Sequence, residues 1–243
     1  MKEIEEHEAT HSLVDEVEER LLNYFKEHNV QIGDSLPKEL ELVETLGVAR
    51  SVVREALSRL RMMGLIKTRT KRGMILSEPN LIGGIQRVIS PHFFRPSTLL
   101  DLLELRISLE IGFCTQIVDL ITDEQIEALS QTVERSVFHE NKSYDLVDEF
   151  AFHTMLYDIS QNRFVKDFQL ILHPVMNYVK KNYESELHSI NESLSESEQL
   201  VTHSDLLAAL KTKKAETFRL AMERHFFSYR SFIKEQRILI SNP

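Results

Sequence analysis

The fold is decided by residues 46–73, LGVARSVVREALSRLRMMGLIKTRTKRG. Apolar residues recur at helical spacing between positions 52 and 63, which predicts an amphipathic helix that stops at Gly64. Before it, the apolar residues of positions 40–46 fit one face of another helix, and Gly47 supplies the left-handed residue that ends such a helix. Two short helices joined by a tight glycine-containing turn form a helix-turn-helix.

A small wing is predicted directly after the second helix. Positions 65–68, LIKT, and positions 74–76, MIL, are predicted to form two short strands, and the basic segment RTKRG at positions 69–73 is the tip between them. The N-terminal part of the chain is therefore predicted to be a winged helix-turn-helix.

The basic residues of the chain are concentrated in this element. Positions 47–76 hold eight cations and one anion, a net charge of about +7, whereas the whole chain carries −9, which leaves about −16 for the remainder. A basic element in an acidic protein is typical of a surface that binds a polyanion, and nucleic acid is the obvious one. Nucleic acid is therefore the predicted partner of this element.

Arg50 and Arg54 lie four residues apart, so both project from one side of the second helix near its N-terminus, where a recognition helix meets base edges and phosphates. An isolated arginine pair at this spacing is more often a solvated helix face. The wing, the turn and the charge contrast favour DNA recognition here.

Length and composition indicate two domains. The 243 residues exceed the usual size of one domain, so about 75 residues of DNA-binding domain leave room for a larger partner. The single cysteine, Cys114, lies in an apolar helical run and is expected to be a buried, inert thiol. No apolar run reaches the length of a membrane span, and the first residues are acidic, so we expect a cytoplasmic protein without a membrane partner.

The segment after position 76 is predicted to be almost entirely helical. It shows repeated helix-start patterns, at Ser97, Thr122-x-x-Gln125, Ser143, Asn162, Ser195-x-x-Glu198 and Thr212, and neither an alternating strand pattern nor a glycine-rich phosphate loop. The fold class is therefore mainly α, with an N-terminal winged helix-turn-helix followed by an all-helical antiparallel bundle. The expected domains are residues 1–76, a linker and connecting helix at 77–96, and the bundle at 97–243.

One arginine is expected in the interior of the bundle. Arg106 stands in a run that is apolar nearly all round, and a buried guanidinium must find an anion. Glu110, one helical turn later, could supply it. Alternatively Arg106 faces a cavity and holds the carboxylate of a ligand.

Three histidines and a carboxylate form a candidate metal site. Glu149 and His153 are four residues apart and share one helix face, while His203 and His225 lie on later helices in phases that can point inward. One carboxylate and three imidazoles can hold a divalent ion and leave positions open for a ligand oxygen. A single inward histidine is more often a hydrogen-bonded core residue, and His173 has no spacing that assigns it to the metal.

The N-terminal motifs resemble the DNA-binding domain of the GntR family of bacterial transcription regulators. The matching motifs are Leu36-Pro37, Gly47-Val48-Ala49-Arg50-Ser51-Val52-Val53-Arg54-Glu55-Ala56-Leu57, Gly64-Leu65-Ile66 and Arg72-Gly73. The resemblance implies that Arg50 and Arg54 contact guanines or phosphates, that Ser51 contacts a phosphate, and that Arg72 with Gly73 places the wing in the minor groove. Ala49 departs from the family's Ser or Thr, and Leu40 from a frequent Arg or Lys, which implies weaker binding or a different operator.

The C-terminal part resembles the FCD domain, the ligand-binding domain of the FadR subfamily of GntR regulators. This helical bundle binds Zn, Ni or Mn in many members, through one Asp and three His. The matching motifs are Glu104-Leu105-Arg106-Ile107-Ser108-Leu109-Glu110, Phe152-His153, Ser160-Gln161-Asn162, His203 and Met222-Glu223-Arg224-His225. The resemblance implies a metal held by Glu149, His153, His203 and His225, and an effector carboxylate held by Arg106. Glu149 stands where the family has Asp, and Asp148 is the weaker candidate because it points about 100° away on a helix.

The expected protein is a homodimeric transcription regulator, a repressor, controlled by a small carboxylate effector. The alternatives are a metal-dependent enzyme fused to a DNA-binding domain, and a regulator whose metal is only structural or is itself the signal. No His-Glu-x-x-His motif supports the enzyme.

Overall fold

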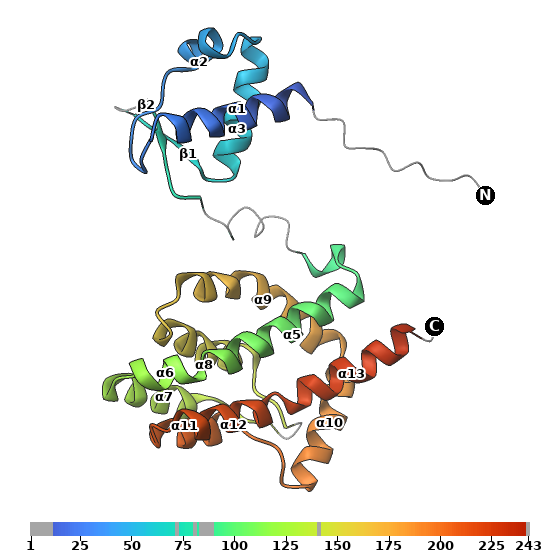
Figure 1. Ribbon diagram of the computed structural model, residues 1–243. Helices are drawn as coiled ribbons and strands as arrows, with labels where there is room; N and C mark the ends of the chain where they lie inside the picture. The colour runs from blue at the N-terminus through green and yellow to red at the C-terminus, as the bar shows by residue number, and fades with distance from the viewer. Residues whose placement is uncertain (1–11, 71–72, 80–81, 83–89, 140–141, 242–243) are drawn as a thin grey trace, which may run out of the picture. The chain divides into compact units, whose positions relative to one another are not determined.

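The computed structural model describes residues 12–70, 73–79, 82, 90–139 and 142–241. The chain divides into two compact units, Met1–Arg87 and Val88–Pro243, and the division falls inside the segment expected to connect the domains (Figure 1). None of the described helices is both long enough and apolar enough to cross a membrane.

The first unit is a winged helix-turn-helix, as predicted. Its elements are α1 (Leu13–Glu27), α2 (Glu39–Leu46), α3 (Arg50–Met62), β1 (Ile66–Arg69) and β2 (Gly73–Leu76). Gly47 ends α2 with a left-handed φ of 67°, and Gly64 follows α3 with a φ of 77°. These two glycines set the turn between the helices and the entry into the wing.

Helix α1 is not predicted from the sequence. A capping box at its start joins Ser12 and Asp15, and one face of the helix buries Val17, Leu21 and Phe25. That face packs against α3, so α1 completes the core beneath the recognition helix.

The wing is a two-stranded antiparallel ribbon in which Ile66 pairs with Leu76 and Arg69 with Gly73. The chain before α2 runs along its other edge, because the Leu36 N–H donates to Met74 O and the Leu76 N–H donates to Asp34 O. The ribbon is thereby attached to the helical core rather than free.

The described residues of the second unit form helices, the loops between them and one isolated β-bridge between Phe138 and Tyr144, which confirms the predicted mainly α fold class. Its elements are η1 (Pro91–Phe93), α5 (Pro96–Gly112), α6 (Cys114–Leu120), α7 (Asp123–Arg135), α8 (Leu146–Ile159), α9 (Arg163–Asn182), α10 (Glu184–Glu196), α11 (His203–Lys211), α12 (Ala215–His225) and α13 (Phe227–Ser241).

The packing in this unit brings helices that are distant in sequence around one core. Helix α5 packs against α9 and α13, α8 packs between α7 and α9, and α11 packs against α7 and α12 (Figure 1). Four phenylalanines are fully buried there, namely Phe152, Phe218, Phe226 and Phe232. Cys114 is buried as predicted, and burial raises the pKa of its thiol to about 12.

Several helix boundaries differ from the prediction. Ser195 does not start a helix: α10 continues to Glu196, Glu198 has a left-handed φ of 54°, and the capping box before α11 joins Thr202 and Asp205. The Ser195-x-x-Glu198 pattern here lies at the end of α10, so the pattern alone misplaces the start. Ser143 lies ahead of its helix, which begins after Asp145.

Two long predicted helices are each divided. The predicted apolar run that contains Arg106 divides at Phe113, directly after the helix-weakening Gly112. The run after Thr212 divides at Phe226, although its N–H donates to Met222 O and its carbonyl accepts from the Arg230 N–H. Hydrogen bonds continue in the same way across Phe113, so a single non-helical residue separates the two helices at each division.

Candidate metal centre

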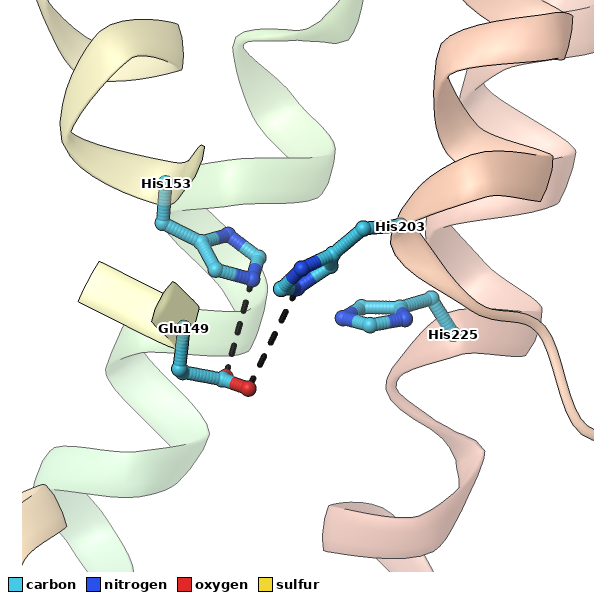
Figure 2. A group of neighbouring side chains, drawn as sticks. All are labelled: Glu149, His153, His203 and His225. Atoms are coloured by element: carbon cyan, nitrogen blue, oxygen red, sulfur yellow. Dashed lines mark ion pairs between the residues drawn. The ribbon is translucent and has the colours of Figure 1, made fainter. Parts of the chain in front are cut away.

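Glu149, His153, His203 and His225 come together in the interior of the helical unit. Each offers one ligand atom, and these four atoms lie within 4.8 Å of one another. Figure 2 shows Glu149 and His153 on one side, facing His203 and His225 on the other. These are the four residues predicted from the sequence, and the fold places them together.

Local structure fixes where each side chain points. Glu149 and His153 occupy successive turns of α8 on its buried face. His203 is the first residue of α11, which Thr202 caps, and His225 is the last residue of α12. Two helix ends and one helix face therefore meet at the site.

The carboxylate lies near two of the imidazoles. Glu149 Oε1 is 3.6 Å from His153 Nε2, and Glu149 Oε2 is 3.9 Å from His203 Nε2. Burial by itself would raise the pKa of the Glu149 carboxyl, but Lys180 and then Arg106 hold this pKa well below its ordinary value. Glu149 is therefore an anion at neutral pH.

The imidazoles have nitrogens without hydrogen-bond partners. They are Nε2 of His153, Nε2 of His225 and both nitrogens of His203, all buried. Buried polar atoms are normally satisfied, so several such atoms facing one point need an explanation. A divalent cation at this point would bind the lone pairs, and a nitrogen and oxygen donor set suits Zn²⁺ and its first-row neighbours.

Outer contacts orient two of the rings. His225 Nδ1 lies 2.7 Å from the carbonyl oxygen of Val201, and His153 Nδ1 lies 2.5 Å from Glu110 Oε2. An imidazole that donates Nδ1–H to an oxygen presents an unprotonated Nε2, the form that binds metal. Both rings are therefore held in the ligating tautomer.

Burial favours the neutral form of the His203 and His225 imidazoles. It lowers the pKa of His225 to about 4 and that of His203 well below its ordinary value. Both rings are uncharged at pH 7, and a metal ion does not have to displace a proton from them.

Arg106 binds the two buried carboxylates of Glu110 and Glu149. Its Nε donates to Glu110 Oε1 at 2.8 Å and its Nη2 donates to Glu149 Oε1 at 3.1 Å, while its guanidinium carbon is 5.3 Å from the centre of the Phe226 ring. The predicted pairing with Glu110 is thus present. The side chain is only 4% exposed, and Arg106 is absent from the described residues that line the neighbouring cavity.

A cavity of about 340 Å³ adjoins the four-residue cluster. Glu149 and His225 contribute to its wall together with Tyr144, Lys180, Thr202 and Tyr229. Lys180 is the cation nearest the cluster on that wall: its Nζ donates to Tyr144 O at 3.0 Å and lies 3.4 Å from Glu149 Oε2. Lys180 was not predicted from the sequence, although it lies four residues after the buried Met176 and so extends the buried face of α9.

Three further expectations meet clear outcomes. Asp148 points away from the site and accepts from the Val137 N–H at 2.9 Å, which leaves Glu149 as the carboxylate of the cluster. His173 is exposed and stacks on Phe150 with ring centres 4.0 Å apart, so it does not face the cavity. Asn162 caps α9, as expected.

The predicted DNA-binding residues lie on the surface of the first unit. Arg50, Ser51 and Arg54 are exposed along the first turns of α3, and Arg50 Nε donates to Glu39 Oε1 at 2.6 Å. Ala49 makes no side-chain cap, and Leu40 is exposed beside Glu39.

The predicted wing tip is described only in part. Gly73 begins β2 with a left-handed φ of 70° and has open space where a Cβ would stand. Arg72 lies outside the described residues.

The FCD domain family matches residues 101–228, and the family described as bacterial regulatory proteins, gntR family, matches residues 13–76. The chain belongs to the FCD domain family. This FCD protein thus carries a GntR-type helix-turn-helix in its first unit, and the four residues of its candidate metal site fall within the FCD match.

Curated relatives are similar over part of their length. The FCD protein is 32% identical to the HTH-type transcriptional regulator LutR of Bacillus subtilis, over 58% of this chain and 65% of LutR. It is 29% identical to the HTH-type transcriptional repressor NanR of Enterobacter sp., over 63% of this chain and 61% of NanR. The matches thus span about three fifths of these relatives. The matched families and these relatives are regulators rather than enzymes.

Among solved structures, Streptococcus agalactiae GntR aligns with a TM-score of 0.51 and 24% identity, over 90% of this chain and 100% of that chain. This likeness shows the fold.

Proposed function

We propose that the protein is a DNA-binding transcription regulator whose helical unit binds a divalent metal ion and a small organic acid. The observation that carries the proposal is the buried cluster of Glu149 and three histidines with unsatisfied nitrogens, adjoining a cavity of about 340 Å³. A cavity with a few convergent polar groups beside a metal-binding set is typical of a ligand site.

Glu149, His153, His203 and His225 would hold the metal, with Zn, Ni and Mn as candidates. A bound ion supplies Lewis acidity and open coordination positions for an oxygen of the ligand. Because Glu149 and His225 also line the cavity, a ligand there could reach the ion. The ion could take part in binding the ligand, only stabilise the fold, or be the regulatory signal itself. Titration of organic acids into metal-loaded and metal-free protein separates these three roles.

The first unit would bind operator DNA through α3 and the wing. Arg50 and Arg54 would contact guanines or phosphates in the major groove, Ser51 a phosphate, and Arg72 with Gly73 the minor groove. The exposure of the first turns of α3 supports this role. We further propose a homodimer on a pseudo-palindromic operator, because a two-fold symmetric protein matches two half-sites.

We propose a repressor of the FadR type acting in the cytoplasm. The similarity to NanR, which is named as a transcriptional repressor, supports this sign of regulation. The energetic demand is small, since a coupling of ~1–3 kcal/mol between effector and operator is enough for regulation.

One experiment tests the DNA-binding function. The full-length protein is used to select sequences from a random double-stranded library, and the affinity for the selected sequence is compared with that for unrelated DNA at one salt concentration. We expect enrichment of a two-fold symmetric sequence. Absence of any enrichment, with the protein folded, contradicts the function.

A further inference from the structure

The charges around the metal site balance without any metal. Arg106 and Lys180 supply two positive charges, and Glu110 and Glu149 supply two negative charges. Both oxygens of Glu149 are engaged by this pair of cations: Oε1 lies 3.1 Å from Arg106 Nη2, and Oε2 lies 3.4 Å from Lys180 Nζ. Glu110 is bound by Arg106 at 2.8 Å.

A divalent ion upsets this balance. The three imidazoles must be neutral to donate their lone pairs, so they cannot offset the charge of the ion. The loaded site would therefore carry a surplus of about two positive charges in an interior where Arg106, Glu110 and Glu149 have little contact with water. Buried charge without a counter-charge is strongly unfavourable.

The carboxylates at the cavity mouth are poorly placed to compensate. The Asp145 side chain is 66% exposed and lies 3.1 Å from His139 Nε2, and Glu184 is also exposed. Solvent screens such groups from a buried ion. The compensating charge is therefore expected from an anion that enters the cavity.

Lys180 is the cation that can change partners. Its side chain is 18% exposed and lines the cavity, whereas that of Arg106 is 4% exposed and does not. A metal ion on Glu149 would share the charge of that carboxylate and weaken its hold on Lys180. The flexible Lys180 side chain then allows its ammonium group to reach an anion that enters the cavity.

We propose that metal and a small dianionic organic acid bind this site cooperatively, with Lys180 transferring from Glu149 to a carboxylate of the acid. The proposal rests on the proposed metal site, and it ranks dianions above monoanions of equal size, because two negative charges offset the surplus in full. Cooperativity must be reciprocal, so each ligand raises the affinity of the other by the same factor.

The decisive variant is Lys180→Met, because the charge argument gives it two effects of opposite sign. Loss of one nearby positive charge should tighten binding of Zn²⁺ alone by about tenfold or more. The same loss should weaken binding of the acid to Zn²⁺-loaded protein by about tenfold or more. A purely structural lysine would weaken both or neither.

The experiment is titration calorimetry on the full-length protein without DNA, after removal of metal with a chelator. Zn²⁺ is titrated alone, and succinate and succinamate are titrated into metal-free and Zn²⁺-loaded protein. Succinamate has nearly the same shape but one negative charge fewer. Lys166→Met is the matched control, since Lys166 lies on the same helix, is exposed and pairs with Asp158 at 2.7 Å. Lys180→Gln replaces Lys180→Met if circular dichroism shows that the latter is unfolded.

We expect succinate to bind the loaded protein at least tenfold more tightly than the metal-free protein and more tightly than succinamate, with both preferences reduced by Lys180→Met and kept by Lys166→Met. Equal succinate affinity with and without Zn²⁺, absence of succinate binding, or unchanged or weaker Zn²⁺ binding by the Lys180 variant overturns the inference. Failure of the wild-type protein to bind Zn²⁺ contradicts the proposed metal site itself.

Discussion

His153 Nδ1 lies 2.5 Å from Glu110 Oε2, so a carboxylate on α5 fixes the ring of a histidine on α8. The opposite nitrogen of that ring, Nε2, has no hydrogen-bond partner and lies 3.6 Å from Glu149 Oε1. Burial would raise the pKa of Glu110, but His153 and Arg106 bring it down to about 2, so the orienting group is an anion. A residue outside the proposed ligand set thus controls the tautomer of one of its histidines.

Glu110→Gln should therefore lower Zn²⁺ affinity without removing a ligand. An amide is a weaker acceptor for the imidazole N–H, and loss of such a partner costs about 10- to 100-fold in metal affinity. Competition with a chromophoric chelator measures the change. Glu104→Gln, on the exposed side of α5, is the control and should bind Zn²⁺ as the wild type does.

The ligands themselves are tested by metal content. Wild-type protein should take up about one divalent ion per chain, and the ion should raise the melting temperature because it binds the folded state. His203→Ala/His225→Ala should lose both effects, measured by elemental analysis and thermal unfolding. Full occupancy in the double variant would refute the site, whereas His173→Ala should change nothing because His173 is exposed.

The stability of metal-free protein should depend on pH through His225. Its pKa is about 4 in the fold, against about 6.5 for an unfolded histidine, so the unfolded chain takes up the proton first as pH falls. The part of the free energy of unfolding that depends on a neutral His225 is fully present above pH ~6.5 and is lost progressively toward pH ~4. The total loss is about 3 kcal/mol.

Urea unfolding at pH 7.5, 6 and 5 measures this slope, followed through the tyrosines of the helical unit. His225→Gln should flatten it. An equally steep slope in that variant would assign the pH dependence to other groups.

Operator recognition should depend on α3. Arg50→Ala should cost ~1–3 kcal/mol on the selected operator and relax its sequence preference, because a bidentate arginine contact discriminates between bases. Arg54→Ala is expected to act in the same way, as measured by fluorescence anisotropy. Lys26→Ala, at the exposed end of α1, is the control in the same unit. Unchanged operator affinity in the double arginine variant, with helicity intact, would end this assignment.

Arg106 should act mainly on stability. Arg106→Ala leaves Glu110 and Glu149 buried without their shared cation, and breaking a buried pair in this way costs about 3–5 kcal/mol. Thermal unfolding and effector response are measured on the same variant. A variant that keeps its stability and its metal but loses the response to an organic acid would instead support direct contact between Arg106 and the acid, as the family resemblance implies.

The parts predictable from sequence were those that local patterns specify. Gly47 and Gly64 mark the ends of the two helices of the turn, and the spacing of Glu149 and His153 places both on one face of α8. The inward phases of His203 and His225 were also readable, although the boundary before His203 was not, since Thr202 rather than Ser195 caps that helix.

The missed parts depend on tertiary packing. Glu110 was expected to pair with Arg106 on its own helix, and nothing in its spacing indicates that His153 would approach its other oxygen. Lys180 looks like an ordinary solvated lysine at the end of a helix until α8 and α9 pack together and bring Glu149 within 3.4 Å. The α1 helix was missed although its own sequence indicates a helix, with Val17, Leu21 and Phe25 at four-residue spacing; only the α3 face that it covers is a matter of tertiary packing.

His203 stands at the first residue of α11 and His225 at the last residue of α12, whereas Glu149 and His153 belong to α8. An ion bound by all four would act as a removable cross-link between α8 and both outer ends of the α11–α12 pair. Its arrival would restrain a long loop of chain in one step, as a disulfide does, but reversibly and without an oxidant. Proteolysis in the segment between α10 and α11 should then slow as free metal rises, so the supply of metal in the cell would set the rigidity of the unit that receives the effector.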